Sequence, residues 1–263
     1  MARPASDSNS SFNMSSAICV MDASSCLGTR LVKCLLKRGY TVHAATLQNY
    51  GESSFLNEVD CKDDEDDDDD DKIKKLKSFK WDPFDYHSIV DALKGCSALF
   101  YSFESPSDHS TCDLWHALSK TLAEKTAWAL AMDRGVNMVS VNAGLVMDPD
   151  LTITNPYLKG AAEMYEDGVF VTVDLDFLVE AHICVYEEIS TYGRYLCFNH
   201  IINQTQDAVK LANMLSPLPP SPQSLENDTK IIQQRISNKK LNKLMVECQP
   251  QINDLLANQE ECL

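Results

Sequence analysis

The stretch that most constrains this chain lies between residues 17 and 45, where two short apolar runs flank a segment of helical periodicity. The runs are Ile18–Met21 and Tyr40–Thr46, and between them Gly28–Arg38 places its apolar residues at helical spacing before Gly39. Unbroken apolar runs are typical of parallel strands that are buried on both faces, and a glycine commonly ends a helix. The stretch therefore predicts a strand, a tight turn, a helix and a second strand, which is how a dinucleotide-binding sheet begins.

The same alternation continues along the chain. Strands are predicted near residues 76–80, 97–102, 136–141, 168–173 and 194–198, and helices over 83–94, 117–134, 176–189, 206–215 and 237–246. Ser237 is expected to cap the last helix. Alternation of this kind predicts an α/β protein with a Rossmann-type, doubly wound, mostly parallel sheet and a small C-terminal extension.

Composition divides the chain into four segments. Residues 1–16 are rich in serine and lack the apolar centre of a signal peptide, so we expect a disordered N-terminus. The dinucleotide-binding-like core is expected over 17–150, including an acidic loop at 60–72. Residues 151–247 are expected to form the substrate side, with some strands joining the main sheet, and residues 248–263 a loose tail.

The net charge of −16 is mostly local, because nine acidic residues form one run from Asp63 to Asp71. Without these nine charges, the net charge would be −16 + 9 = −7. Like charges in a row repel one another and stay solvated, so the run predicts a disordered loop, with an interaction patch or cation binding as the alternative. The acidity argues against nucleic acid and anionic membranes as partners.

The ten cysteines contain no CxxC pair, and several lie within apolar patterns. This predicts buried thiols in a reducing compartment and no metal site. No apolar stretch is long enough to cross a bilayer, so the expected location is the cytoplasm.

The first turn of the expected nucleotide site has lost glycines. In the short-chain pattern T-G-x-x-G-x-x-G, aligned on Gly28, the first two glycines become Asp22 and Ser25. Small residues are needed there because the backbone approaches the pyrophosphate at the N-terminus of the helix. A carboxylate within about 5 Å of a phosphate costs on the order of a kcal/mol or more. Two interpretations remain open, namely retained nucleotide binding and a strand–turn–helix without a ligand.

The ends of the next two strands carry less information. Thr46-Leu47-Gln48 offers neither the acid expected of an NAD site nor a nearby Arg for NADP. Asp82 follows the third strand, where it could bind an adenine amino group or cap a helix beside Pro83.

Six segments together resemble one family: LVKCLLKRGYTVHA, LKGCSALFYSF, LSKTLAEKTAWALA, GVNMVSVNAGLVMDP, VTVDLDFLVEAHI and GRYLCF. They are similar to plant cinnamoyl-CoA reductase-like and dihydroflavonol reductase-like proteins, which are extended short-chain dehydrogenases, over most of residues 17–200. The resemblance implies an NADP-dependent carbonyl reductase that acts on phenylpropanoid-type substrates, either small aromatic carbonyls or CoA esters. Any protein partner is unknown.

The resemblance also carries over individual catalytic positions. Lys120 matches the family lysine that binds the ribose, and His116 stands where the family has its proton-donating tyrosine. An imidazole can act as a general acid near neutral pH. The alternatives are a helix-start histidine and a surface lysine. The implied cofactor-binding residues are Asp22, Ser25, Gly28, Asp82 and Lys120.

A segment of the family pattern is missing. Only Phe103–Leu114 separates the fourth expected strand from Trp115, where the family places a helix and the strand that carries its catalytic serine. We therefore expect a sheet shortened by one strand. The strand near residues 136–141 either moves inward by one strand spacing, about 4.8 Å, or stays in place and leaves an empty slot inside the sheet.

These observations support two functional hypotheses. The first is an NADP-dependent oxidoreductase of the cinnamoyl-CoA reductase-like group, impaired in this chain and binding NADP weakly or not at all. The alternative is a non-catalytic relative, a pseudoenzyme, that binds nucleotide or a protein. A third interpretation is a shortened product of a longer relative that folds poorly.

Overall fold

A computed structural model describes residues 17–47, 75–102, 113–149, 151–215 and 231–248 of the chain. The chain forms two compact units, residues 1–104 and 105–263, and each is described by itself. The boundaries expected from composition, with a core ending near residue 150, stay a prediction. The expected N-terminal disorder, acidic loop and loose tail lie outside the described residues.

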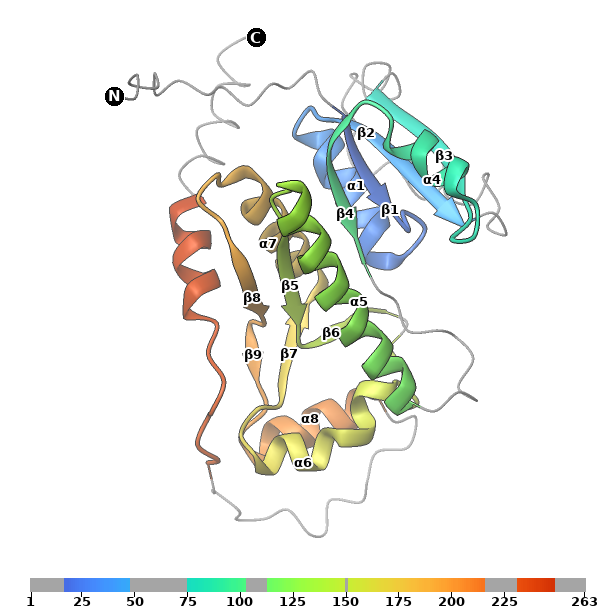
Figure 1. The fold of residues 1–263 in the computed structure, drawn as a ribbon. Coiled ribbons are helices and arrows are strands. Elements are labelled where there is room, and N and C mark those ends of the chain that lie inside the picture. The colour runs from blue at the N-terminus through green and yellow to red at the C-terminus, as the bar shows by residue number, and fades with distance from the viewer. Residues whose placement is uncertain (1–16, 48–74, 103–112, 150, 216–230, 249–263) are drawn as a thin grey trace, which may run out of the picture. The chain divides into compact units, whose positions relative to one another are not determined.

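The first unit is a four-stranded parallel sheet with the order β3-β2-β1-β4 (Figure 1). Its elements are β1 (Ala17–Met21), α1 (Cys26–Lys37), β2 (Thr41–Leu47), β3 (Leu76–Trp81), α4 (Tyr86–Leu93) and β4 (Cys96–Tyr101). Each matches an element predicted from the sequence, to within three residues at either end. The α/β class with a parallel, doubly wound sheet is confirmed.

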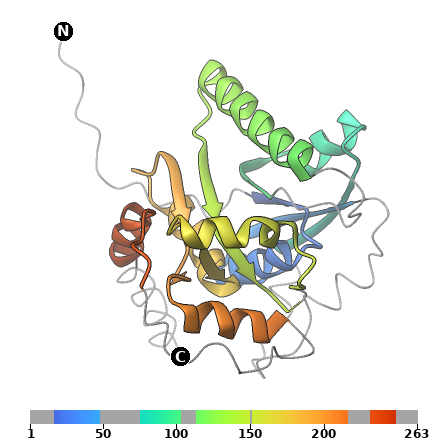
Figure 2. The same ribbon diagram turned by 90° about the horizontal axis from the view of Figure 1, so that it is seen from below.

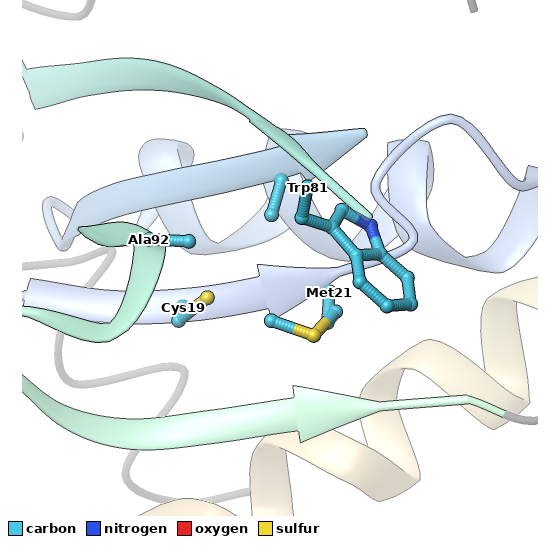
Figure 3. Packing of buried hydrophobic residues seen from close by; sticks show 5 residues of the cluster. Cys19, Met21, Trp81 and Ala92 are labelled. Carbon is cyan, nitrogen blue, oxygen red and sulfur yellow. The ribbon is translucent and has the colours of Figure 1, made fainter. Parts of the chain in front are cut away.

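Helices α1 and α4 cover opposite faces of this sheet. Successive side chains of β1 point to opposite faces, so they alternate between the two helices. Cys19 and Met21 face a cluster that includes Ala92 of α4 (Figure 3). Ile18 and Val20 face the other way and are fully or almost fully buried. The buried residues of α1, among them Leu31 and Leu35, lie on one helix face at i, i+4 spacing. All five residues of β1 are buried, which is why its sequence reads as an unbroken apolar run.

The second unit contains shorter strands in two sheets. The elements are α5 (Asp113–Arg134), β5 (Val139–Ala143), β6 (Leu145–Met147), a 3₁₀ helix (Pro156–Gly160), α6 (Ala161–Glu166), β7 (Val171–Asp174), α7 (Leu175–Glu187), β8 (Gly193–Cys197), β9 (His200–Ile201) and α8 (Thr205–Leu215). β5 pairs with β8 in parallel, and β7 pairs with β6 in parallel and with β9 antiparallel. The strands of the described residues thus form three hydrogen-bonded sheets.

Two packed regions hold the second unit together. One is a cluster built on Leu145, Phe170, Ile202 and Leu211, with contributions from α6 and α8, which lie side by side in Figures 1 and 2. The other includes a last helix, residues 239–248, in which Leu241 is fully buried and whose Cys248 thiol lies 3.9 Å from the carbonyl oxygen of Cys184 in α7. That helix was predicted two residues earlier, and the Ser237 hydroxyl accepts a hydrogen bond from the backbone N–H of Lys239 at its start.

The first turn of α1 depends on a glycine that has no room for a side chain. A Cβ on Gly28 would lie 2.3 Å from the carbonyl oxygen of Asp22 and 2.9 Å from the Cα of Ala23. Both atoms belong to the backbone and cannot rotate away. We expect Gly28→Ala to lower the free energy of unfolding by about 3 kcal/mol or more, because strand and helix must separate.

The matched control is Gly95→Ala. Gly95 has a φ of +82° and no atom within 4 Å of an added Cβ, so only backbone strain of about 1–2 kcal/mol is expected. Urea unfolding followed by circular dichroism compares the two variants. Equal losses in both would contradict the steric account of Gly28.

Candidate functional site

The turn between β1 and α1 keeps the shape of a glycine turn although an aspartate occupies it. Asp22 has a φ of 64°, and among the described residues no other non-glycine has a positive φ. The Ala23 N–H donates to the carbonyl of Ala45 at 2.9 Å, and the Ser25 N–H donates to the carbonyl of Asp22 at 3.1 Å. Left-handed backbone is tolerated by Asp better than by most residues, at some cost relative to Gly. The backbone path of the predicted turn is therefore retained with a carboxylate added.

Ser25 takes the capping position of α1. Its Oγ accepts a hydrogen bond from the Gly28 N–H at 2.9 Å, and the side chain is buried. Thr29 adds a second tie, since its hydroxyl donates to the carbonyl of Ala23 at 3.0 Å. Substituting Ser for the second glycine thus gives the helix an internal acceptor at the terminus where a phosphate would bind.

The Asp22 carboxylate lies in an environment that disfavours its charge. Burial raises the pKa of Asp22, and a hydrogen bond with the Ser24 side chain acts in the opposite direction. The pKa of Tyr101, the last residue of β4, is raised by burial and then by the charge of Asp22. The carboxylate therefore acts on the carboxyl ends of both β1 and β4, the edge of the sheet where a nucleotide would lie.

The ends of β2 and β3 lie next to one another at the same edge. Leu47 pairs in register with Trp81, and neither residue offers a charge. Asp82 follows directly, and its Oδ1 accepts from the Phe84 N–H at 2.9 Å. The helix cap proposed for Asp82 is wrong, because α4 begins later and is capped by Asp85, which accepts from the His87 N–H at 3.0 Å.

The two proposed catalytic positions lie on α5, in the second unit. This helix begins at Asp113, four residues earlier than expected, so His116 and Lys120 are one turn apart near its start. Lys120 is half-buried, and the His116 side chain lies outside the described side chains. The structure places these two residues on one helix, and the cofactor-binding candidates Asp22, Ser25, Gly28 and Asp82 in the first unit.

One turn beyond Lys120, Glu124 is the acceptor of a polar network that ties α5 to two strands. Its Oε1 accepts from Arg194 Nε of β8 at 2.6 Å and from Ser140 Oγ of β5 at 2.9 Å. Trp128 Nε1 lies 3.2 Å from the same oxygen and 3.1 Å from Ser140 Oγ. Burial alone would raise the pKa of Glu124, but these hydrogen bonds and the guanidinium charge outweigh it and lower the pKa.

Sequence reasoning missed this network. The available signal was the spacing of Lys120, Glu124 and Trp128, which share one helix face at i, i+4 intervals. Arg194 lies 70 residues from Glu124, so no local pattern could pair them. The network fixes the face of α5 that packs against β5 and β8, which is the face of Lys120.

The described residues contain no cluster of three or more His, Cys, Asp or Glu side chains arranged to hold a metal ion. Among the helices in the described ranges, none combines the length and apolar character needed to span a bilayer. No disulfide joins the described cysteines, and burial raises the pKa of Cys197 to about 12.

The fold is that of the NAD(P)-binding Rossmann reductases. Vestitone reductase from alfalfa aligns over 87% of this chain and 92% of its own, with a TM-score of 0.61 and 19% identity. The yeast methylglyoxal/isovaleraldehyde reductase Gre2, solved with NADPH, aligns over 87% and 92% with a TM-score of 0.53 and 16% identity. At these identities the likeness establishes the fold.

The sequence relatives are reductases of one group. Cinnamoyl-CoA reductase 1 of Petunia hybrida is 25% identical over 302 positions, covering 89% of this chain and 88% of its own. Tetraketide alpha-pyrone reductase 1 of Arabidopsis thaliana is 33% identical over 122 positions, 43% of this chain and 37% of its own. No family model matches the chain. Homologues of this chain are thus cinnamoyl-CoA reductases and tetraketide alpha-pyrone reductases, which confirms the resemblance.

The chain is shorter than the Petunia relative within the aligned region. The alignment spans 302 positions, and 89% of 263 residues is about 234, so 302 less 234 leaves about 68 positions without a counterpart here. In the structure, α5 begins 12 residues after the end of β4, and β4 is an edge strand of its sheet.

The burial of Asp22 makes stability depend on pH. Its pKa is raised in the folded state, so its contribution is most favourable below the ordinary pKa of Asp, about 3.9, and is lost as pH rises through the folded pKa. We expect the Asp22→Asn variant to gain stability over the natural chain as pH rises through this window and to hold a constant advantage above it. Urea midpoints between pH 4 and 8 measure the difference, and a gap that narrows with rising pH would contradict the burial of the carboxylate.

Proposed function

We propose that this chain is an NADP(H)-binding relative of the cinnamoyl-CoA reductases whose nucleotide affinity and reductive turnover are both weakened. One observation carries the proposal: Asp22 holds a carboxylate, at a φ of 64°, in the turn where the pyrophosphate of a dinucleotide lies. NADPH, where bound, supplies a hydride to a carbonyl or thioester carbon. The substrates implied by the relatives are small aromatic carbonyls or CoA esters.

Several features fit a nucleotide. The helix N-terminus of α1 points its N–H groups toward the edge of the sheet, and Gly28 allows the close approach of α1 to the turn. Asp82 stands at the end of β3, where the adenosine half would lie. The pyrophosphate would lie against the turn that contains Asp22, Ser25 and Gly28. On the resemblance alone, Lys120 would bind the nicotinamide ribose and His116 would donate the proton.

The Asp22 carboxylate opposes this arrangement. Two unit charges 4 Å apart repel by about 1 kcal/mol in bulk water and about 4 kcal/mol at an effective dielectric constant near 20. Each 1.4 kcal/mol is a factor of ten in affinity, so the carboxylate weakens binding by roughly fivefold to several hundredfold. This range is compatible with weak nucleotide binding and also with its loss.

A second candidate function is that of a pseudoenzyme that binds nucleotide without turnover. The replacement of the family tyrosine by His116 favours it. The short connection between β4 and α5 also favours it, because that connection lacks room for the strand that carries the family serine. The two candidates differ only in turnover, so binding is tested first.

The binding test compares the natural chain with Asp22→Gly by NADPH fluorescence titration. We expect the glycine variant to bind NADPH at least about fivefold more tightly, because the repulsion is removed and the left-handed turn is restored to its preferred residue. Asp85→Asn is the matched control: it removes one exposed charge and keeps a capping side chain at α4, so its affinity should equal that of the natural chain.

Three outcomes are distinguished. Equal affinity in the natural chain and in Asp22→Gly would remove Asp22 from the site. Saturable binding with the expected gain supports the proposal. Absence of binding in every variant, together with a broad non-cooperative melt, would overturn it and indicate a chain that folds poorly.

The pH dependence gives an independent measure. Because the pKa of Asp22 is raised, acidification neutralises it and should strengthen NADP⁺ binding in the natural chain relative to Asp22→Asn. The phosphate of the ligand also titrates near pH 6, but it does so equally for both proteins. Calorimetric titrations between pH 4 and 8 should show two affinity curves that approach one another as the pH falls, and parallel curves would contradict a raised pKa at Asp22.

Turnover is tested on a panel of hydroxycinnamoyl-CoA esters and aromatic aldehydes. We expect slow NADPH oxidation that Lys120→Ala abolishes and that Lys125→Ala, an exposed lysine on the same helix, leaves unchanged. Saturable NADPH binding with no substrate-dependent oxidation would establish the pseudoenzyme instead.

A further inference from the structure

Trp81 closes the carboxyl edge of the first sheet on the face covered by α4. It is the last residue of β3 and is 7% exposed. Its neighbours in the buried cluster include Met21, the last residue of β1, and Ala45 near the end of β2. Figure 3 shows the indole lying at the carboxyl ends of these strands, with Met21 beside one edge of the ring.

The indole of Trp81 carries a polar group that the surrounding protein does not satisfy. Its Nε1 is buried and has no hydrogen-bond partner among the described residues. Buried tryptophans usually place this N–H against an acceptor. Trp128 does so, since its Nε1 lies within hydrogen-bond distance of Glu124 and Ser140. A phenylalanine would fill much of the same apolar space at Trp81 without an unsatisfied donor.

The position of this donor coincides with one half of the proposed nucleotide site. Ligands of parallel α/β sheets bind outside the carboxyl ends of the strands, and the adenosine ribose lies at the end of the second strand. Trp81 pairs in register with Leu47 at the end of β2, and Asp82 is the next residue in the chain. No other part of a dinucleotide lies at this end of the edge.

We propose that Trp81 is a further nucleotide-binding residue, whose indole N–H donates a hydrogen bond to an acceptor atom of the adenosine half. This inference rests on the proposed function. It assigns the adenosine end a neutral donor at an edge where β2 ends without the acid or arginine that usually contacts the ribose. It also separates the two ends of the site, because Asp22 opposes the pyrophosphate while Trp81 favours the adenosine.

The donor is covered in the protein without nucleotide, so binding requires a side chain at the edge to move. Leu47 stands opposite Trp81 on the same face of the sheet and is 40% exposed. A side chain so exposed loses little burial when it rotates away. Leu47→Ala is therefore expected to leave the affinity unchanged or to increase it.

The test follows the indole N–H signals of the ¹⁵N-labelled natural chain by NMR, assigned with Trp81→Phe, Trp115→Phe and Trp128→Phe. The probes are NADP⁺, adenosine 2′,5′-bisphosphate and nicotinamide mononucleotide. We expect the first two to move the Trp81 signal downfield and the third to leave it in place. In calorimetry, Trp81→Phe should weaken NADP⁺ binding by about fivefold, the equivalent of one neutral hydrogen bond, and Trp128→Phe should not weaken it.

Stability separates this role from a structural one. Trp128→Phe removes a donor that lies within hydrogen-bond distance of Glu124 and Ser140, so it should lower the melting temperature more than Trp81→Phe, which removes a donor that has no partner among the described residues. A Trp81 signal that is downfield without ligand and unmoved by NADP⁺ would assign the N–H to a buried water and overturn the inference.

Failure of the Trp81 inference can be distinguished from failure of the proposed nucleotide binding. If NADP⁺ binds but neither the Trp81 signal nor the Trp81→Phe affinity responds, the inference fails and the proposed function stands. If no probe binds the natural chain or Asp22→Gly, both fail. The NMR measurement on the natural chain remains decisive even where Trp81→Phe does not fold.

Discussion

The close approach of α1 to the end of β1 is the contact on which the first unit depends. It exists because Gly28 has no side chain, so the carbonyl of Asp22 and the Cα of Ala23 can lie where a Cβ would be. The Ala23 N–H then reaches the carbonyl of Ala45, which ties the turn to β2. The same close approach brings the Gly28 N–H to the Ser25 hydroxyl, which caps the helix at the carboxyl edge of the sheet.

The turn between β1 and α1 keeps the backbone shape of a glycine turn although its charge differs. Asp22 takes the left-handed backbone that a glycine would take, and Ser25 replaces a second glycine while capping the helix. The backbone path therefore survives both substitutions. What changes is the electrostatic potential at the point where the helix N-terminus would otherwise attract a phosphate. The sequence already shows the carboxylate at this position, and the structure adds its partial burial and its effect on the pKa of Tyr101.

Most of the fold could be predicted from sequence because burial leaves a regular pattern of apolar residues. The pattern is a short apolar run in β1 and β2 and helical spacing in α1. β6 and β9 escaped prediction because three and two residues are too few to show a period. The cap of α4 was misplaced because Pro83 suggested a helix start, whereas the chain first makes a turn at Asp82 and begins the helix after Asp85. The Glu124 network and the unsatisfied Trp81 N–H depend on distant contacts and on burial, which no local pattern records.

The pairing of β5 with β8 has a consequence for how the chain is made. Every hydrogen-bonded strand of the first sheet has been synthesised once residue 101 is added, so that unit can fold as it emerges from the ribosome, while the rest of the chain is still being made. β5 must wait for β8, whose first residue is Gly193, and Glu124 must wait for Arg194. During that interval α5 exists without the strand and the guanidinium that later fix its face. The backbone groups of β5 and the Glu124 carboxylate therefore lack these partners while the roughly fifty residues between Ala143 and Gly193 are translated. A chaperone would act during this interval.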